Sequence, residues 1–151
     1  MTGAGDTGRA ILERWAAGGD MPSLARTLGI RLVALGDGTV TAACRIGEGH
    51  LNLAGMVHGG TVAALFDAAT GAALLSLLDA GERFATADLT VKYLIGIPGD
   101  VGDLYAEARI VHRGGRLALA EALARDAGGT VYARALATLS VSRPAGGTQG
   151  T

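Results

Sequence analysis

The chain has 151 residues, of which 49% are hydrophobic and 18% charged, and its formal net charge at pH 7 is −1. This length and composition are typical of one globular domain with a buried core, and they argue against a disordered chain. Because acidic and basic residues are mixed and no long basic run occurs, neither nucleic acid nor an anionic membrane is expected as a partner. This charge balance does not exclude a nucleotide-bearing small ligand.

Cysteine and histidine usage restricts the possible sites. Cys44 is the only cysteine, which excludes an intrachain disulfide and a cysteine-based zinc site. At their spacings, His50, His58 and His112 supply too few ligands for a metal ion, so neither a metal nor a cofactor is expected. Residues 1–8 contain no apolar run of the kind found in signal peptides, and we therefore expect a cytoplasmic location.

The first predicted elements are short. Residues 9–17 predict an amphipathic helix, and residues 21–28 predict another helical turn. The hydrophobic period then changes to two, so residues 30–35 and 39–46 predict a hairpin around the turn Gly36-Asp37-Gly38.

One long apolar helix is predicted from about Gly59 to Asp79. Its segment Val62 to Leu78 is almost wholly apolar, but it is short for a bilayer and contains Asp67. We therefore expect a helix buried on all sides by its own protein, not a membrane span.

Four strand-like segments follow the long helix, separated by glycine-containing turns, at residues 86–93, 103–110, 117–125 and 130–142. Strands linked by short turns are antiparallel neighbours, so these segments predict a four-strand meander. Together with the hairpin they predict an α+β domain with about six strands in one sheet, whose apolar face packs on the long helix. We expect residues 1–151 to form one domain, with residues 1–8 and 144–151 flexible.

The start of the long helix offers unusual chemistry. Gly59 and Gly60 leave backbone N–H groups uncovered where a helix has no internal partners for them, which suits an anion or a developing oxyanion. The alternative is that the two glycines simply turn a loop into a helix. Asn52 and His58 precede them; asparagine can donate an amide hydrogen bond, and histidine can orient a group or cap the helix.

Asp67 is the only charged residue of the apolar segment. No cation lies three or four residues away from it, and a buried unpaired carboxylate is costly or acquires a raised pKa. Unless a strand supplies an Arg or Lys partner, this carboxylate faces a cavity and is a candidate base or nucleophile.

The spacing of Gly59 and Asp67 predicts an assembly. They are eight residues apart, which is about 12 Å along a helix axis and too far for one side chain to close. If the N–H donors at Gly59 and the carboxylate of Asp67 act on one substrate atom, they must therefore come from two different subunits. Two such helices packed antiparallel about a two-fold axis would meet this requirement, and the small-residue stripe Ala63, Asp67, Gly71 permits close approach. We therefore predict a homodimer with two shared sites.

The chain contains neither a Gly-x-Ser-x-Gly motif nor a phosphate- or dinucleotide-binding glycine motif, so a serine hydrolase is not expected. The pattern Asn52…Gly55…His58-Gly59-Gly60…Leu65…Asp67 instead resembles the motif of hotdog-fold acyl-CoA thioesterases of the phenylacetate-pathway (PaaI-like) type. The resemblance extends over about residues 28–142. It implies a hotdog fold, with the sheet wrapped around the central helix, dimers that pair through an edge strand, and often tetramers.

The resemblance also implies roles for individual residues in hydrolysis of an aromatic or medium- to long-chain acyl-CoA to free acid and CoA. The N–H of Gly59 polarises the thioester carbonyl, and Asp67 from the opposite subunit serves as nucleophile or general base. Asn52 and His58 orient the thioester, and the hydroxyl of Thr86 helps position water. Gly60 is a further candidate for a substrate contact. The candidates for contacts with the CoA phosphates are the basic residues Arg83, Lys92, Arg113 and Arg116.

The chain departs from the family pattern at Gly96-Ile97-Pro98-Gly99, where an aromatic/basic-Pro turn is usual. This departure leaves the acyl group and the CoA contacts open. Two other functions stay open as well. One is a non-catalytic acyl-CoA-binding or regulatory hotdog module, and the other is a hotdog hydratase or dehydratase acting on acyl thioesters.

Overall fold

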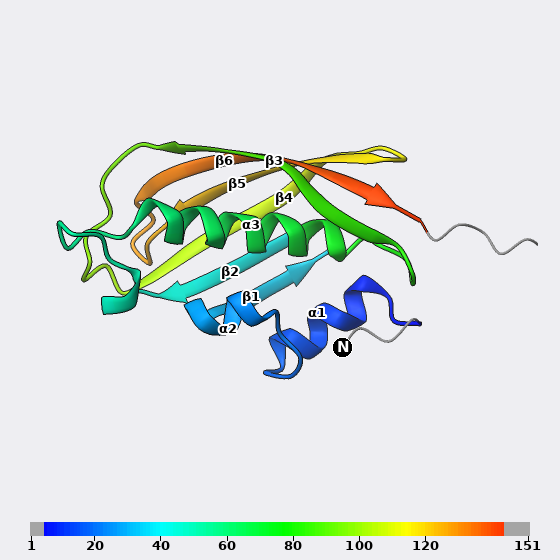
Figure 1. The fold of residues 1–151 in the computed structure, drawn as a ribbon, viewed down its shortest axis with the longest axis horizontal. Helices are drawn as coiled ribbons and strands as arrows, with labels where there is room; N and C mark the ends of the chain where they lie inside the picture. Colours follow the sequence, from blue (N-terminus) through cyan, green and yellow to red (C-terminus); the bar gives the residue numbers. More distant parts are fainter. Residues whose placement is uncertain (1–4, 144–151) are drawn as a thin grey trace, which may run out of the picture.

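The computed structural model describes residues 5–143, which form one sheet and three helices (Figure 1). The helices are α1 (Gly8–Ala16), α2 (Ser23–Leu28) and α3 (Gly59–Leu75), with a short 3-10 turn at Glu48–His50. The strands are β1 (Ile30–Gly36), β2 (Thr39–Arg45), β3 (Arg83–Tyr93), β4 (Asp103–Arg113), β5 (Leu117–Arg125) and β6 (Val131–Ser142).

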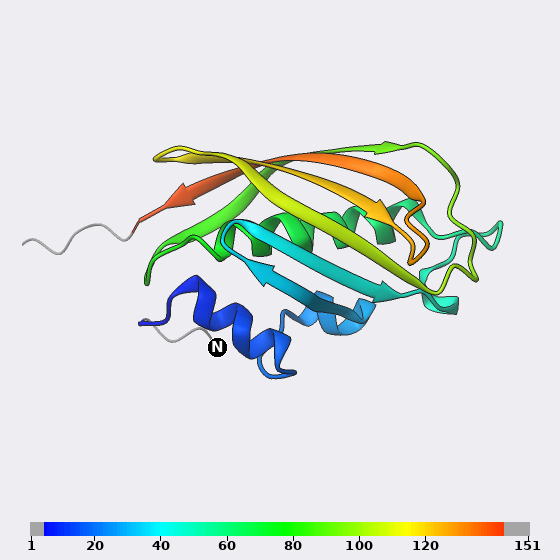
Figure 2. The same cartoon turned by 180° about the vertical axis from the view of Figure 1, so that it is seen from behind.

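All six strands belong to one antiparallel sheet in the order β1-β2-β4-β5-β6-β3. The sheet curls around α3, and α1 and α2 lie beside β1 at one edge (Figures 1 and 2). This arrangement confirms the α+β prediction of a six-stranded antiparallel sheet around one long helix, and it is the hotdog fold that the resemblance implied.

The predicted four-strand meander is wrong for its first strand. β3 pairs with β6 and not with β4, which instead pairs with β2. The connection 94–102 is therefore not a hairpin turn; it crosses from one edge of the sheet to its middle. On its way it passes the loop before α3, where the N–H of Val57 donates to the carbonyl of Ile97 at 2.9 Å. The crossing brings the end of β3 to the start of α3.

The core lies between α3 and the inner face of the sheet. Leu65, Phe66 and Leu74 of α3 are fully buried there. Facing them are alternate, inward-pointing alanines of β5 and β6, whose small side chains let the helix approach the strands closely. Burying one leucine or phenylalanine side chain contributes about 1.5–3 kcal/mol, so these contacts fix the position of α3.

The long helix ends earlier than predicted, at Leu75 and not at Asp79. The hydroxyl of Ser76 donates to the carbonyl of Ala73 at 2.7 Å and accepts the N–H of Gly38 at 2.8 Å. The last turn of α3 is thus tied to the β1–β2 turn, where Gly38 has the positive φ of 70° that favours glycine. Among residues 5–143, no helix is long and apolar enough to cross a membrane.

Within the segment 1–8, which is predicted to be flexible, Thr7 and Gly8 make hydrogen bonds to later parts of the chain. The hydroxyl of Thr7 accepts the N–H of Ala10 at 3.3 Å and caps α1, while the N–H of Gly8 donates to the carbonyl of Leu78 at 3.1 Å. The same prediction for residues 1–4 and 144–151 lies outside the described residues.

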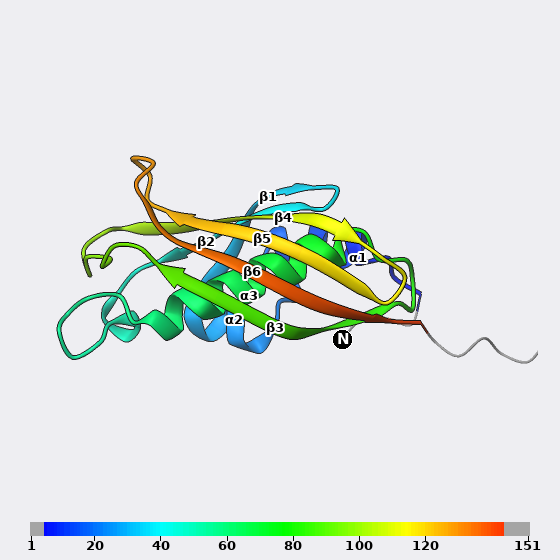
Figure 3. The same ribbon diagram turned by 90° about the horizontal axis from the view of Figure 1, so that it is seen from above.

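Two surfaces of the sheet stay uncovered. No helix within residues 5–143 packs on its outer face (Figure 3). The strand β3 pairs with β6 along one side only, so its other edge presents unpaired backbone groups. Most of β3 is exposed, including the small residues Ala85, Thr86 and Ala87.

Candidate active site

His58 caps the start of α3. Its backbone is extended (φ −64°, ψ 135°), and its ring Nδ1 accepts the N–H of Gly60 at 3.0 Å. In the neutral ring the proton therefore resides on Nε2, which makes that nitrogen a hydrogen-bond donor. The histidine thus caps the helix with one nitrogen and keeps a donor on the other.

The first turn of α3 leaves one N–H without an acceptor. The N–H groups of Thr61 and Val62 both donate to the carbonyl of His58, at 2.9 and 3.4 Å, and that of Gly60 is taken by the His58 ring. Within this first turn, the N–H of Gly59 alone has no acceptor among residues 5–143. A free N–H at the positive end of a helix suits a carbonyl oxygen that becomes negative.

Tyr93 covers the other side of Gly59. Its hydroxyl donates to the carbonyl of Gly59 at 2.6 Å. A Cβ atom on Gly59 would lie 3.2 Å from the Tyr93 ring and hydroxyl, so a larger residue here requires the half-exposed Tyr93 side chain to shift by a few tenths of an ångström. Tyr93 was not among the residues predicted for the site; the available signal was its place at the end of the alternating apolar positions Leu89, Val91 and Tyr93.

The loop before α3 is held by backbone contacts. The side-chain carbonyl of Asn52 accepts the N–H groups of Ala54 and Met56 at 2.9 and 3.1 Å, which leaves its amide N–H groups free to donate outward. The backbone carbonyl of His50 accepts the N–H of His58 at 2.8 Å. Asn52 and His58 line one hollow of about 660 Å³. The structure therefore brings Asn52, His58 and Gly59 together.

Asp67 is exposed, which corrects the prediction of a buried carboxylate. The sheet ends at β3 and leaves one stripe of α3 uncovered, comprising Gly60, Ala63, Ala64 and Asp67. The hydroxyl of Thr86 donates to Oδ1 of Asp67 at 2.7 Å, and no cation within residues 5–143 pairs with this carboxylate. Asp67 and Thr86 thus form a second polar group, separate from the donors at Gly59.

The predicted small-residue stripe Ala63, Asp67, Gly71 is wrong for Gly71, which is not part of the exposed face of α3. Gly71 is buried, and a Cβ atom there would lie 3.0 Å from the Phe84 ring. The glycine therefore accommodates a side chain of its own chain instead of permitting the approach of another helix.

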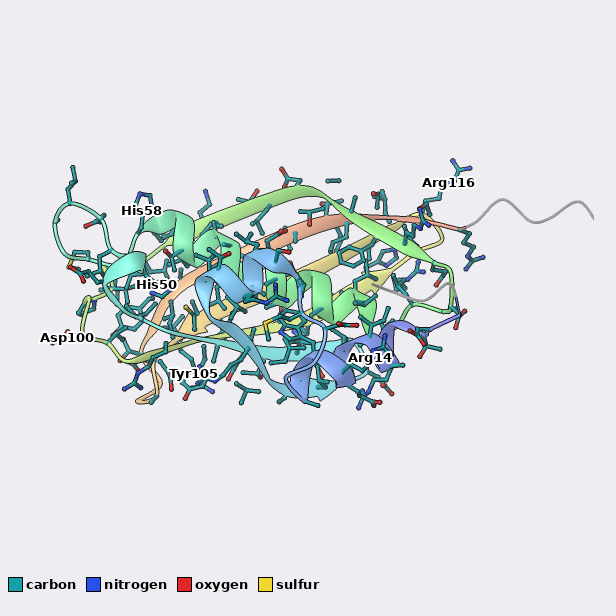
Figure 4. All side chains as sticks on the ribbon, turned by 60° about the horizontal axis from the view of Figure 1, so that its bottom comes forward. Arg14, His50, His58, Asp100, Tyr105 and Arg116 are labelled. Carbon is teal, nitrogen blue, oxygen red and sulfur yellow. The ribbon has the colours of Figure 1, made fainter. Side chains whose placement is uncertain are left out.

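The basic candidates lie away from Gly59 of the same chain. Lys92 lines a hollow of about 820 Å³ on the outer face of the sheet, where Arg134 is its partner in the strand register. Arg113 pairs with Glu82 at 3.6 Å. Arg116 and His58 lie at opposite ends of the molecule (Figure 4). Arg83 begins β3, at the end of that strand far from Tyr93.

Cys44 and His50 do not form a nucleophilic pair, although Sγ and Nε2 are 3.6 Å apart. The His50 Nδ1 accepts the N–H of Gly47 at 3.0 Å, so Nε2 carries the proton, donates to the carbonyl of Leu28 at 2.9 Å and is not available as a base. Burial raises the pKa of the Cys44 thiol, which disfavours the thiolate. Between residues 5 and 143 there is no cluster of three His, Cys, Asp or Glu side chains that could hold a metal ion.

The candidate site therefore consists of two separate groups of side chains and donors, which we call its two halves. Gly59, Asn52 and His58 supply hydrogen-bond donors, and Asp67 with Thr86 supplies a carboxylate and a hydroxyl. The eight residues between Gly59 and Asp67 on α3 separate the two halves by about 12 Å. One chain cannot apply both halves to the same atom.

Comparisons with known proteins give the family and the fold. The family model of the thioesterase superfamily matches residues 54–133, which include His58, Gly59, Asp67 and Thr86 but not Asn52. The phenylacetic acid degradation-related protein of Ralstonia eutropha JMP134 is 26% identical, with 85% of this chain and 98% of that chain covered and a TM-score of 0.78.

A thioesterase family protein from Silicibacter pomeroyi is 25% identical, with 94% and 100% covered and the same TM-score of 0.78. A thioesterase from Haemophilus influenzae, 22% identical with 80% and 83% covered, shares the fold with a TM-score of 0.75. No curated protein matches the chain.

Proposed function

The chain belongs to the thioesterase superfamily and is a hydrolase of thioester bonds, and we propose that it cleaves an acyl-CoA into the free acid and CoA in a homodimer whose subunits share each site. One observation carries the proposal. The only unpartnered N–H of the first turn of α3 and the exposed Asp67–Thr86 pair belong to one helix but are too far apart to serve one substrate.

The uncovered parts of the chain support such a dimer. The stripe Gly60, Ala63, Ala64 and Asp67 has only small side chains around the acid, so a second helix can approach it closely. The free edge of β3 lies beside this stripe and can pair antiparallel with the same edge of a second copy. The uncovered outer face leaves room for a dimer of dimers.

The geometry supports the following sequence of steps. The thioester carbonyl accepts the N–H of Gly59, while the amide of Asn52 and the Nε2–H of His58 orient the thioester. In each chain the hydroxyl of Thr86 donates to Oδ1 of Asp67. Oδ2 of the partner's Asp67 is therefore free to act on the thioester.

As a nucleophile, Oδ2 attacks the carbonyl carbon, the C–S bond breaks with departure of the CoA thiolate, and water then hydrolyses the acyl anhydride. As a base, Oδ2 takes a proton from water, and the water oxygen attacks the carbonyl carbon instead; the C–S bond then breaks, and the departing CoA thiolate takes up the proton. In both cases the oxyanion of the tetrahedral intermediate lies at Gly59.

The CoA phosphates need cations near this site. In an antiparallel pairing of two β3 edges, the start of one strand approaches the end of the other. Arg83, at the start of one strand, then lies near the partner's Tyr93, at the end of the other. This makes Arg83 the best supported of the basic candidates. Lys92 projects to the outer face and Arg113 is paired with Glu82, so both are weaker candidates.

Asp67→Asn tests the proposal, with Asp88→Asn, a change of another exposed acid, as the matched control. General acid–base catalysis contributes about 10²–10⁴ in rate, so kcat for acyl-CoA hydrolysis should fall by that order in Asp67→Asn and stay near wild type in the control. The assay covers aromatic and aliphatic acyl-CoAs and enoyl-CoA hydration. An Asp67→Asn enzyme with near wild-type kcat contradicts the mechanism, and binding or hydration without hydrolysis contradicts the function.

A further inference from the structure

The peptide group between Gly59 and Gly60 is hydrogen-bonded at both ends by side chains of its own chain. Its carbonyl accepts the hydroxyl of Tyr93 at 2.6 Å, and its N–H donates to Nδ1 of His58 at 3.0 Å. We propose that Tyr93 is a positioning residue for the reaction, which acts through this peptide group to hold His58 in the tautomer that donates from Nε2. The inference rests on the proposed function and adds a residue that the sequence motif does not include.

Tyr93, the peptide group and His58 form one continuous chain of hydrogen bonds, because the carbonyl and the N–H of a trans peptide point in opposite directions. The distance of 2.6 Å lies at the short end of the range for a bond between a hydroxyl and an oxygen. Each bond in such a chain polarises the next and strengthens it by about 10–30%. The Tyr93 hydroxyl therefore makes the N–H of Gly60 a better donor to Nδ1 of His58.

The two glycines give these side chains room. Neither Gly59 nor Gly60 has a positive φ, so the backbone conformation does not account for them. A Cβ atom on Gly59 would lie 3.2 Å from the hydroxyl oxygen of Tyr93, and one on Gly60 would lie 3.2 Å from Nδ1 of His58. With glycine at both positions, both side chains reach the peptide group without a shift.

The tautomer of His58 decides what the ring offers to the thioester. Nδ1 accepts the N–H of Gly60, so the proton of the neutral ring resides on Nε2. Nε2 has no partner among residues 5–143 and is available to the substrate. The other tautomer would set a second N–H against that of Gly60 and turn a lone pair toward the thioester. A stronger donor at Gly60 disfavours that tautomer.

His50 provides an internal comparison. Its Nδ1 also accepts a backbone N–H, that of Gly47, at the same distance of 3.0 Å. The carbonyl of that peptide group belongs to Ile46, and no tyrosine hydroxyl donates to it within residues 5–143. The two histidines therefore differ in the donor behind the peptide group.

The first test measures the hydrogen bonds by NMR in the ¹⁵N-labelled full chain, without substrate, at about pH 8, where an ordinary histidine is neutral. A scalar coupling across each N–H···Nδ1 bond reports its strength, and the ring nitrogen shifts report the tautomer. Tyr93→Phe keeps the ring and removes the hydroxyl. It should lower the coupling between Gly60 and His58 by about 10–30% or more, and the coupling between Gly47 and His50 should stay unchanged.

The matched control is Tyr132→Phe, which removes a hydroxyl that donates to Asp126 at 2.9 Å and should change neither coupling. Three results overturn the inference: a wild-type His58 protonated on Nδ1, an unchanged coupling to His58 in Tyr93→Phe, or an equal change of both couplings in that variant.

The second test asks whether Tyr93 acts through His58. Loss of one hydrogen bond corresponds to a change of about two- to tenfold, so Tyr93→Phe should lower kcat for acyl-CoA hydrolysis by that factor. In a His58→Ala background the same substitution should have no further effect, because two residues of one network are not additive. Circular dichroism verifies that each variant is folded.

A full additional loss in the His58→Ala background overturns the inference, since Tyr93 then acts on another group. A wild-type enzyme that hydrolyses no acyl-CoA overturns the proposed function instead, and the NMR couplings then decide the role of Tyr93 alone.

Discussion

At the residue scale, Gly59 combines a free N–H with a close contact to Tyr93. It is also the first residue of α3, the position at which proline is best tolerated because the N–H of that residue has no helical acceptor. His58 before it has the extended backbone that a residue preceding proline prefers. Proline can therefore delete a backbone donor here without breaking the helix.

We predict that Gly59→Pro lowers kcat for acyl-CoA hydrolysis by about 10²–10³, the usual loss on removal of one oxyanion donor. Gly59→Ala is the matched control, because it keeps the N–H and introduces a Cβ at the same distance of 3.2 Å from Tyr93. Its kcat should stay within about tenfold of wild type. Circular dichroism verifies that both variants keep the fold. Equal losses in the two variants would show that the contact with Tyr93, and not the N–H, determines the rate.

At the scale of elements, α3 presents two different faces. Leu65 and Phe66 hold one face against the sheet, and the stripe around Ala63 and Ala64 stays half exposed beside the free edge of β3. A polar side chain on this stripe is harmless to a single chain but obstructs the approach of a second helix. A substitution on this stripe should therefore impair assembly of the dimer without destabilising the subunit.

Replacing Ala63 by arginine should produce a folded but inactive monomer, whereas Ala63→Ser should remain a dimer with near wild-type activity. The reason is steric, since only small residues allow two helix backbones to come close. Sedimentation velocity measures the mass, and circular dichroism measures the fold. A fully active Ala63→Arg dimer would rule out this helix face as the contact.

The connection between α3 and β3 depends on Glu82, whose side chain is only 7% exposed and pairs with Arg143 at 2.8 Å and with Arg113 at 3.6 Å. The hydrogen bond from Arg143, followed by that from the N–H of Asp79, holds the pKa of Glu82 below its ordinary value of 4.5. The folded chain binds this proton more weakly than the unfolded chain. The interaction therefore stabilises the fold above pH 4.5, and the stabilisation is lost as the pH falls through the lowered pKa.

Glu82→Gln should consequently unfold at a lower temperature than wild type at pH 7, and the difference should shrink as the pH is lowered below 4.5. Calorimetric scans at a series of pH values measure it. Glu48→Gln, which changes an exposed glutamate, serves as the control and should show no such trend. A difference that is constant across the series would exclude ionisation of Glu82 as its cause.

At the scale of the whole molecule, local patterns predicted the elements and drew attention to the start of α3, but they did not predict what depends on tertiary contacts. Turn residues and periodicity located all six strands, yet the pairing of β3 with β6 depends on a long crossing that short-range signals do not encode. The same patterns identified Asn52, His58 and Gly59 together. The burial of Asp67 was predicted wrongly because an apolar helix does not reveal which of its faces the sheet leaves open.

In the proposed homodimer, each active site takes Gly59 from one subunit and Asp67 from the other. Gly59→Pro and Asp67→Asn should each be almost inactive as homodimers, because each change damages both sites. A mixed dimer of the two variants has one intact site, which joins the unaltered Gly59 of the Asp67→Asn chain to the unaltered Asp67 of the other chain.

The most direct measurement is the activity of that mixed dimer, purified with two different affinity tags after co-expression. The shared site predicts about half of the kcat of the wild-type dimer, because one of two symmetric sites is restored. A mixed dimer that is as inactive as its two parents would show that both groups must come from the same chain, and it would contradict the account.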